Sequence, residues 1–204
     1  MTPPFRKAAL TLHVLASVGW IGSILGFLVL AVVGWRTADI ETMRACYLAL
    51  AIVGWWAIVP LSLASFVTGV VQGLGTEWGV VRHWWVVAKL GINVVASALL
   101  LLHMQPVDWL AAAVRSSAIP PELDGFRGQL VADAGAAVAV LVVATALSVW
   151  KPRGRTGYGA VEGSVARPIG TPRWVVVSGA ALGLGFLVVV VLHLTGNGLG
   201  GMHR

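Results

Sequence analysis

Long runs of apolar residues dominate the chain, and short polar connections separate them. The runs cover residues 8–34, 45–73, 84–104, 131–150 and 174–195. Each is close to or above the roughly 18–20 residues that an α-helix needs to cross a hydrocarbon core of about 30 Å. We therefore expect an all-α membrane protein, a bundle of about five transmembrane helices in one domain that covers residues 1–204.

Several shorter features refine this pattern. Residues 105–130 predict a short surface helix over Asp108–Val114 and then a break at Pro120-Pro121. Pro60, near the middle of the second run, predicts a kink because proline lacks the backbone N–H of a helical hydrogen bond. After Pro60, small and polar residues recur at helical spacing and should face protein; they are Ser62, Ser65, Thr68, Gly69 and Gln72.

Composition supports a membrane protein and excludes two other classes. The chain is 58% hydrophobic and 11% charged, against about 25% charged in an average soluble domain. The net charge of +6 does not indicate nucleic-acid binding, because the basic residues lie at the ends of apolar runs rather than among aromatics on a polar face. The single cysteine, Cys46, excludes an internal disulfide framework.

The distribution of Lys and Arg predicts the orientation. If the N-terminus is cytoplasmic, the cytoplasmic segments hold Arg6, Lys7, Arg82, Lys151, Arg153, Arg155, Arg167 and Arg173. The opposite side then holds Arg36, Arg44, Arg115, Arg127 and Arg204. The positive-inside rule favours a cytoplasmic N-terminus and an external C-terminus, with 151–173 as a basic cytoplasmic loop.

Polar residues inside the spans fall into two layers. A charge within a span is costly and therefore suggests function, and Lys89 is the only charge well inside one, although it is also near enough to the boundary to snorkel. We call His13, Thr68, Gln72, Lys89, Thr145 and Ser178 the inner polar layer, since their predicted depths agree. We call His103, Asp133 and His193 the outer polar layer.

These histidines suggest a bound haem or metal ion. Two imidazoles from different helices at matched depth can ligate haem b, each through one nitrogen. His103 and His193, with Met104, Met202 and His203 nearby, also form a set of imidazole and thioether ligands that suits copper. An interfacial, purely structural role remains open for each histidine, and for His83 it is the favoured interpretation.

Two segments resemble a known group of membrane proteins. LHVLASVGWIG, Leu12–Gly22, resembles the first helix of CopD-like copper-resistance proteins through His13, Trp20 and Gly22. WWVVAKLGINVVASALLLLHM, Trp84–Met104, is similar to the lysine-bearing helix of the CopD and HemJ group. Together with LSVWKPRG, Leu147–Gly154, they most resemble an actinobacterial integral membrane family of unassigned function.

The resemblance implies a bacterial plasma-membrane protein that handles haem or copper. The chain lacks a second histidine in its first span and has Asp133-Ala134-Gly135 where HemJ has a histidine, so we expect binding by His13, Lys89, His103 and His193 rather than an oxidase. Two alternatives remain. One is a non-catalytic accessory subunit, or a homo-oligomer, whose Gly-x-x-x-Gly faces dock other helices in the bilayer. The other is a small transporter with a path along Lys89.

Overall fold

The structure is a computed structural model, in which the described residues are 2–75, 79–115, 123–151, 154, 156, 173 and 177. The predicted fifth span, 174–195, lies outside them apart from Val177. Most of the 151–173 loop also lies outside, as do three candidate ligands, His193, Met202 and His203. The fold and the site are therefore described for the first four predicted spans.

The described residues form helices and contain no strand. The elements are α1 (Pro3–Arg36), α2 (Ile40–Val53), the π-helical turn η1 (Gly54–Ile58), α3 (Val59–Gly75), α4 (Trp84–Ala113) and α5 (Leu123–Trp150). Because α2, η1 and α3 are continuous, these elements include four helices long and apolar enough to cross a membrane. The prediction of an all-helical, multi-pass membrane protein is thus confirmed for this part of the chain.

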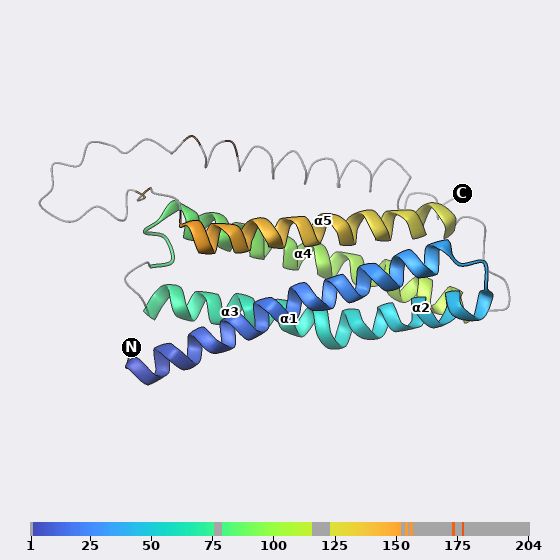
Figure 1. Cartoon of the computed structure of the whole chain (residues 1–204), viewed down its shortest axis with the longest axis horizontal. Coiled ribbons are helices and arrows are strands. Elements are labelled where there is room, and N and C mark those ends of the chain that lie inside the picture. Colours follow the sequence, from blue (N-terminus) through green and yellow to red (C-terminus); the bar gives the residue numbers. More distant parts are fainter. Residues whose placement is uncertain are drawn as a thin grey trace, which may run out of the picture.

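The helices lie side by side, and successive crossings run in opposite directions (Figure 1). We call the end where α1 and α4 begin, and where α3 and α5 end, the N-terminal end of the bundle. At about 1.5 Å per residue, the 34 residues of α1 and the 30 of α4 are about 45 Å or longer. They exceed the hydrocarbon thickness of about 30 Å, so they tilt or extend beyond it.

The core lies mainly between α1 and its neighbours. α1 and α4 each pack against α2, α3 and α5. The α1 residues buried in this core recur every three to four positions, which places them on one helix face; they are Trp20, Ile24, Phe27 and Ala31. Many large apolar side chains outside this stripe are exposed, as expected of helices that face lipid.

The irregularity expected at Pro60 is a π-helical turn immediately before the proline. Val59 donates its backbone N–H to Gly54 O, five residues earlier. Because Pro60 has no N–H and its ring would collide with the carbonyl of Trp56, a wider turn accommodates it. Gly54 also admits the Met104 side chain of α4, whose Cε would be only 2.6 Å from a Cβ at this position.

The expectation of a separate surface helix over Asp108–Val114 is wrong. Residues 108–113 continue α4, which runs through Pro106 to Ala113. The final turns have a buried apolar stripe that packs in the core; its members are Met104, Val107, Leu110 and Val114. This packing extends the helix past the polar Gln105 and the proline, which the local sequence pattern does not predict.

Arg127 of α5 joins three helices at the end opposite the N-terminus. Its Nε donates to Tyr47 Oη of α2 at 2.9 Å, and its Nη2 donates to Gly34 O at 2.6 Å. The same Nη2 lies 3.2 Å from Trp35 O. The guanidinium therefore satisfies carbonyls at the C-terminal end of α1, which have no partner within the helix and carry its partial negative charge.

We predict that Arg127→Met destabilises the bundle. The substitution removes charge-assisted hydrogen bonds to Tyr47 and Gly34, so the free energy of unfolding should fall by about 2 kcal/mol. Unfolding in mixed micelles measures this change. Arg115→Met, at an exposed arginine beyond α4, is the matched control and should leave stability unchanged; equal effects of the two substitutions would contradict the prediction.

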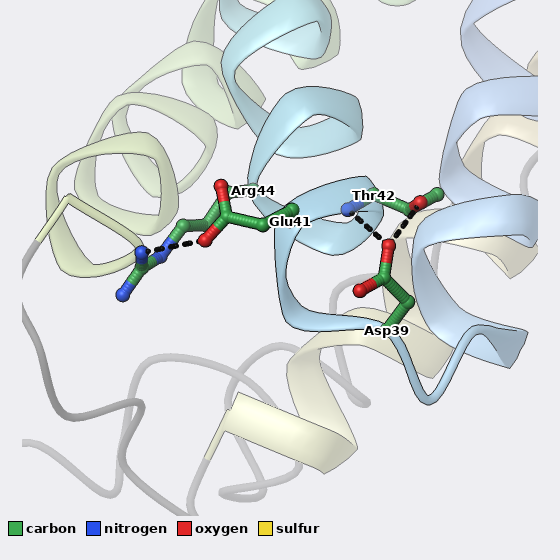
Figure 2. Close-up of polar contacts among 4 residues, drawn as sticks. All are labelled: Asp39, Glu41, Thr42 and Arg44. Carbon is green, nitrogen blue, oxygen red and sulfur yellow. Dashed lines mark hydrogen bonds and ion pairs between the residues drawn. The ribbon is translucent and has the colours of Figure 1, made fainter.

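Asp39 caps the N-terminus of α2 (Figure 2). Its Oδ2 accepts the backbone N–H of Thr42 at 2.9 Å and also the Thr42 hydroxyl. The hydroxyl, and then the backbone N–H, hold the pKa of Asp39 below its ordinary value. One turn along, Arg44 Nη1 and Glu41 Oε1 form an exposed pair at 3.1 Å, so the polar start of α2 is organised by its own side chains.

The lowered pKa of Asp39 predicts a pH-dependent contribution to stability. The folded state binds this proton less tightly than the unfolded state, so the stabilisation is present above about pH 4 and is lost as the pH falls through the folded pKa. Asp39→Asn keeps an acceptor for Thr42 without titrating. The difference in melting temperature, wild type minus Asp39→Asn, should become smaller as the pH is lowered from 5 to 3. A difference that stays constant over this range would contradict the prediction.

Candidate functional site

His13 of α1 is held against α3 in the inner polar layer. Its Nδ1 lies 3.1 Å from Ser65 O and 3.1 Å from Thr68 Oγ1. A carbonyl oxygen only accepts hydrogen bonds, so the contact with Ser65 O assigns the proton of the neutral ring to Nδ1. This tautomer leaves the lone pair of the His13 ring on Nε2. A metal ion would bind at this atom, and a hydrogen-bond donor would also use it.

Small residues of α3 make room for this ring. A Cβ built on Gly69 would lie 3.2 Å from His13 Cε1, so an alanine there would press on the imidazole. One turn further along α1, Ser17 Oγ lies 2.9 Å from Ser65 Oγ. The prediction that the stripe after Pro60 faces protein is confirmed at Ser62 and Ser65, which are 1% and 2% exposed.

Lys89 of α4 is half-buried near the same end of the bundle. Its Nζ lies 5.8 Å from the centroid of the Trp85 ring, which is a cation–π contact. The ammonium is also within electrostatic range of His13 and of Lys151. His13 and Lys89, the two residues that dominate the predicted inner polar layer, thus lie near the same end of the bundle, on α1 and α4.

Two further polar atoms lie along α4 beyond Lys89. Asn93 Oδ1 and Ser97 Oγ are buried and have no hydrogen-bond partner. With Lys89 they are spaced four residues apart, so each lies about one turn beyond the last. The helix therefore carries a polar line from Lys89 into the apolar part of the bundle.

The outer polar layer contains a histidine–carboxylate pair between α4 and α5. His103 Nε2 lies 2.7 Å from Asp133 Oδ2, and His103 Nδ1 lies 2.9 Å from Leu99 O one turn back on its own helix. The two side chains are only 16% and 20% exposed. Both ring nitrogens of His103 are thus engaged, in contrast to those of His13.

Other candidate ligands do not join this pair. Met104 is adjacent to His103 in sequence but points to η1, where it packs against Gly54. His103 lies 14 residues beyond Lys89 on α4, about 21 Å along the axis, so His13 and His103 belong to different sites. His83 precedes α4, and the centroid of its ring lies 6.5 Å from the centroid of the Trp85 ring.

Two polar contacts that sequence patterns did not predict also connect the helices. One is the Arg127 junction at Tyr47. The other is the indole N–H of Trp55 in η1, which donates to the Asp108 carboxylate at 2.9 and 3.0 Å. The only signal for either was a charged residue near the end of an apolar run, and this does not identify the partner.

Within the described ranges, no group of three or more His, Cys, Asp or Glu side chains is arranged to hold a metal ion. Comparisons of the chain with models of protein families, with curated proteins and with solved structures found no significant match. The functional argument therefore depends on the geometry of the two polar layers.

We predict that Ser17 and Ser65 are energetically coupled. Their hydroxyls are 2.9 Å apart between α1 and α3, and such interhelical hydrogen bonds in membranes contribute about 0.6 kcal/mol on average. A double-mutant cycle of Ser17→Ala and Ser65→Ala, measured by unfolding in mixed micelles, should give a coupling of about that size. Strict additivity would contradict the prediction.

Proposed function

We propose that this chain is an integral protein of the bacterial plasma membrane that binds haem b or copper within its helix bundle, for electron transfer or for handling of haem or metal. The observation that carries the proposal is the state of His13. Its Nδ1 is held by Ser65 O and Thr68 Oγ1 between two apolar helices, and Nε2 keeps its lone pair.

Hydrogen bonding of this kind is typical of ligating histidines. A metal-bound imidazole usually donates its second N–H to a carbonyl or carboxylate, which fixes the tautomer and the ring orientation. Ser65 O has this role at His13, and Gly69 leaves space for the ring. The side chain is thus already oriented as a ligand, so little rotational freedom remains to be lost on binding.

The inner polar layer favours haem b over copper. One histidine can serve as the proximal ligand of haem iron, as in globins and peroxidases, so His13 is sufficient from the protein. Lys89 offers an ammonium for a propionate carboxylate, and its cation–π contact with Trp85 orients it. The haem would supply the redox chemistry, while these residues would bind and position it.

The outer polar layer is the candidate site for copper. His103 would be one ligand, and His193, Met202 and His203 lie in a part of the chain that is not described. Binding there requires that His103 Nε2 release Asp133. An imidazole with a free Nε2 needs no such exchange, and this is why we place the primary site at His13.

The charges of the described residues support a cytoplasmic N-terminus. Among the described residues of 2–151, the N-terminal end of the bundle holds five Lys and Arg side chains and the opposite end holds four; they are Arg6, Lys7, Arg82, Lys89 and Lys151 against Arg36, Arg44, Arg115 and Arg127. Lys and Arg favour the cytoplasmic side. On this basis the haem site at His13 and Lys89 lies in the inner leaflet.

The proposal predicts a haem spectrum that depends on His13. Protein produced with ample haem and purified in detergent should show a Soret band, which His13→Gly should abolish and added imidazole should restore. Lys89→Gln should weaken haem retention without abolishing the band. His83→Gln is the matched control, since its ring lies beside Trp85 at the start of α4, and should keep the wild-type spectrum.

Two outcomes would overturn the proposal. Wild-type protein made with ample haem and copper that shows neither a Soret band nor bound copper by elemental analysis would exclude it. A normal Soret band in His13→Gly without imidazole would exclude the inner site. The thermal stability of each variant, measured in the same detergent, separates loss of the ligand from loss of the fold.

One observation favours the accessory-subunit alternative. A Cβ built on Gly22 or Gly26 meets no atom within 4 Å, so this Gly-x-x-x-Gly face of α1 is open in the described part of the chain. Small-residue faces allow close packing of transmembrane helices. A stable partner or a homo-oligomer in mild detergent, disrupted by Gly22→Leu, together with a chain free of haem and copper, would support this function.

The transporter alternative depends on the polar line that Lys89 starts on α4. Asn93 Oδ1 and Ser97 Oγ, which are buried without partners, extend this line, and buried polar atoms often bind water or a solute. Flux into proteoliposomes that disappears in Lys89→Ala would support transport. Wild-type flux in that variant would exclude a path along Lys89.

A further inference from the structure

An open cleft lies on the outer surface of the bundle at the π-helical turn. It is lined by Ala51, Ile52, Trp55 and Trp56. Its volume of about 450 Å³ is within the range of about 300–1,000 Å³ that small-molecule sites occupy. Trp56 is 82% exposed and Trp55 is 43% exposed, so both indoles border the bilayer rather than the core. π-Helical turns inside α-helices are frequent at functional sites.

Trp55 connects this cleft to a carboxylate on α4. Side chains of a helix lean toward its N-terminus, so the indoles lean toward the end of the bundle where α2 begins. The indole N–H of Trp55 donates to the two carboxylate oxygens of Asp108, at 3.0 and 2.9 Å. The cleft therefore has an apolar lining and a negative charge at its edge.

Asp108 lies at the level of the lipid headgroups. It is 24 residues beyond Trp84, where α4 begins, or about 36 Å along the helix axis. The hydrocarbon core is about 30 Å thick, so Asp108 lies at its far boundary when Trp84 lies at the near one. An amphiphile in the cleft would thus have its polar group beside Asp108 and its apolar part along Ile52 and Trp56.

The Asp108 carboxylate has acceptor capacity that the described residues do not use. Its two oxygens offer about four lone-pair sites, and Trp55 supplies a single hydrogen that both oxygens share. No Lys or Arg side chain in the described part of the chain is paired with this exposed carboxylate. The complementary ligand group is therefore a cationic hydrogen-bond donor, and the neighbouring indole faces also attract cations.

These features favour one class of membrane lipid. Asp108 would repel an anionic headgroup. A carbonyl headgroup, such as that of a quinone, needs a donor, but the indole N–H of Trp55 already donates to Asp108. A primary ammonium combines a positive charge with three N–H donors, which fits a carboxylate beside aromatic rings.

We propose that this cleft binds a phospholipid with a primary ammonium headgroup, such as an ethanolamine lipid. The ammonium donates to the carboxylate of Asp108, and an acyl chain lies along Ile52 and against the indole of Trp56. The lipid would bridge α2 and α4 on the surface of the bundle. The site is separate from His13 and needs neither haem nor copper, so it does not depend on the function proposed above.

Native mass spectrometry of the full chain tests this site. The protein is released from micelles that contain equal amounts of three phospholipids, which share their acyl chains and have ethanolamine, choline or glycerol headgroups. The complex with one ethanolamine lipid should exceed the complex with one glycerol lipid about fivefold, as expected for an exposed ion pair of about 1 kcal/mol. The choline lipid should be retained less than the ethanolamine lipid, because its quaternary nitrogen has no N–H to donate.

Two variants with matched controls locate the binding. Asp108→Asn should abolish the preference for the ethanolamine lipid, whereas Asp39→Asn, at an exposed carboxylate before α2, should preserve it. Trp56→Ala should reduce retention of the ethanolamine lipid. Trp150→Ala, at an indole that is 79% exposed at the other end of the bundle, should not.

Several results would overturn the proposal. Equal retention of the ethanolamine and glycerol lipids by wild type would do so, and this comparison decides even if a variant does not fold. Equal retention of the choline lipid, or an unchanged preference in Asp108→Asn, would exclude the hydrogen-bonded ammonium. A dimer that Trp56→Ala dissociates, with no lipid preference, would instead assign this face to a second copy of the chain.

Discussion

The fold depends on the requirement that polar groups inside a bilayer find partners within the protein. Lipid chains solvate apolar side chains about as well as another helix does, so apolar surface alone does not select neighbours. Polar contacts do, because an unpaired group in hydrocarbon is costly. His13 joins α1 to α3, His103 joins α4 to Asp133 of α5, and Arg127 joins the end of α1 to α2. Apolar packing then fills the space between helices that these contacts have paired.

The same requirement gives two histidines different chemistry. His13 meets a carbonyl and a hydroxyl on a single edge of its ring, so one nitrogen remains available. His103 meets a carbonyl on one edge and a carboxylate on the other, so its ring holds a proton on each side or shares one with Asp133. The two histidines thus differ in which ring nitrogens have partners, and they lie in different polar layers of the bundle.

Much of the architecture could be predicted from the sequence, because span length and polar depth depend only on position along a helix. The four spans, and the match in depth of His103 with Asp133, are of this kind. The continuation of α4 past Pro106 was not predictable, since it depends on burial of Val107 and Leu110 in the core. The direction of Met104 was missed for the same reason. It faces the π-turn at Gly54, while its neighbour His103 faces α5.

The sequence by itself determined that the described chain crosses a membrane several times, and at which depths its polar side chains lie, because hydrophobic length and helical rise are local properties. Only the tertiary structure decided which polar groups meet. Helix rotation and the choice of neighbours are set by contacts between distant residues, such as Ser65 with His13 and Asp133 with His103. Which ring nitrogens of the two histidines have partners follows from those contacts, and no spacing along the chain specifies it.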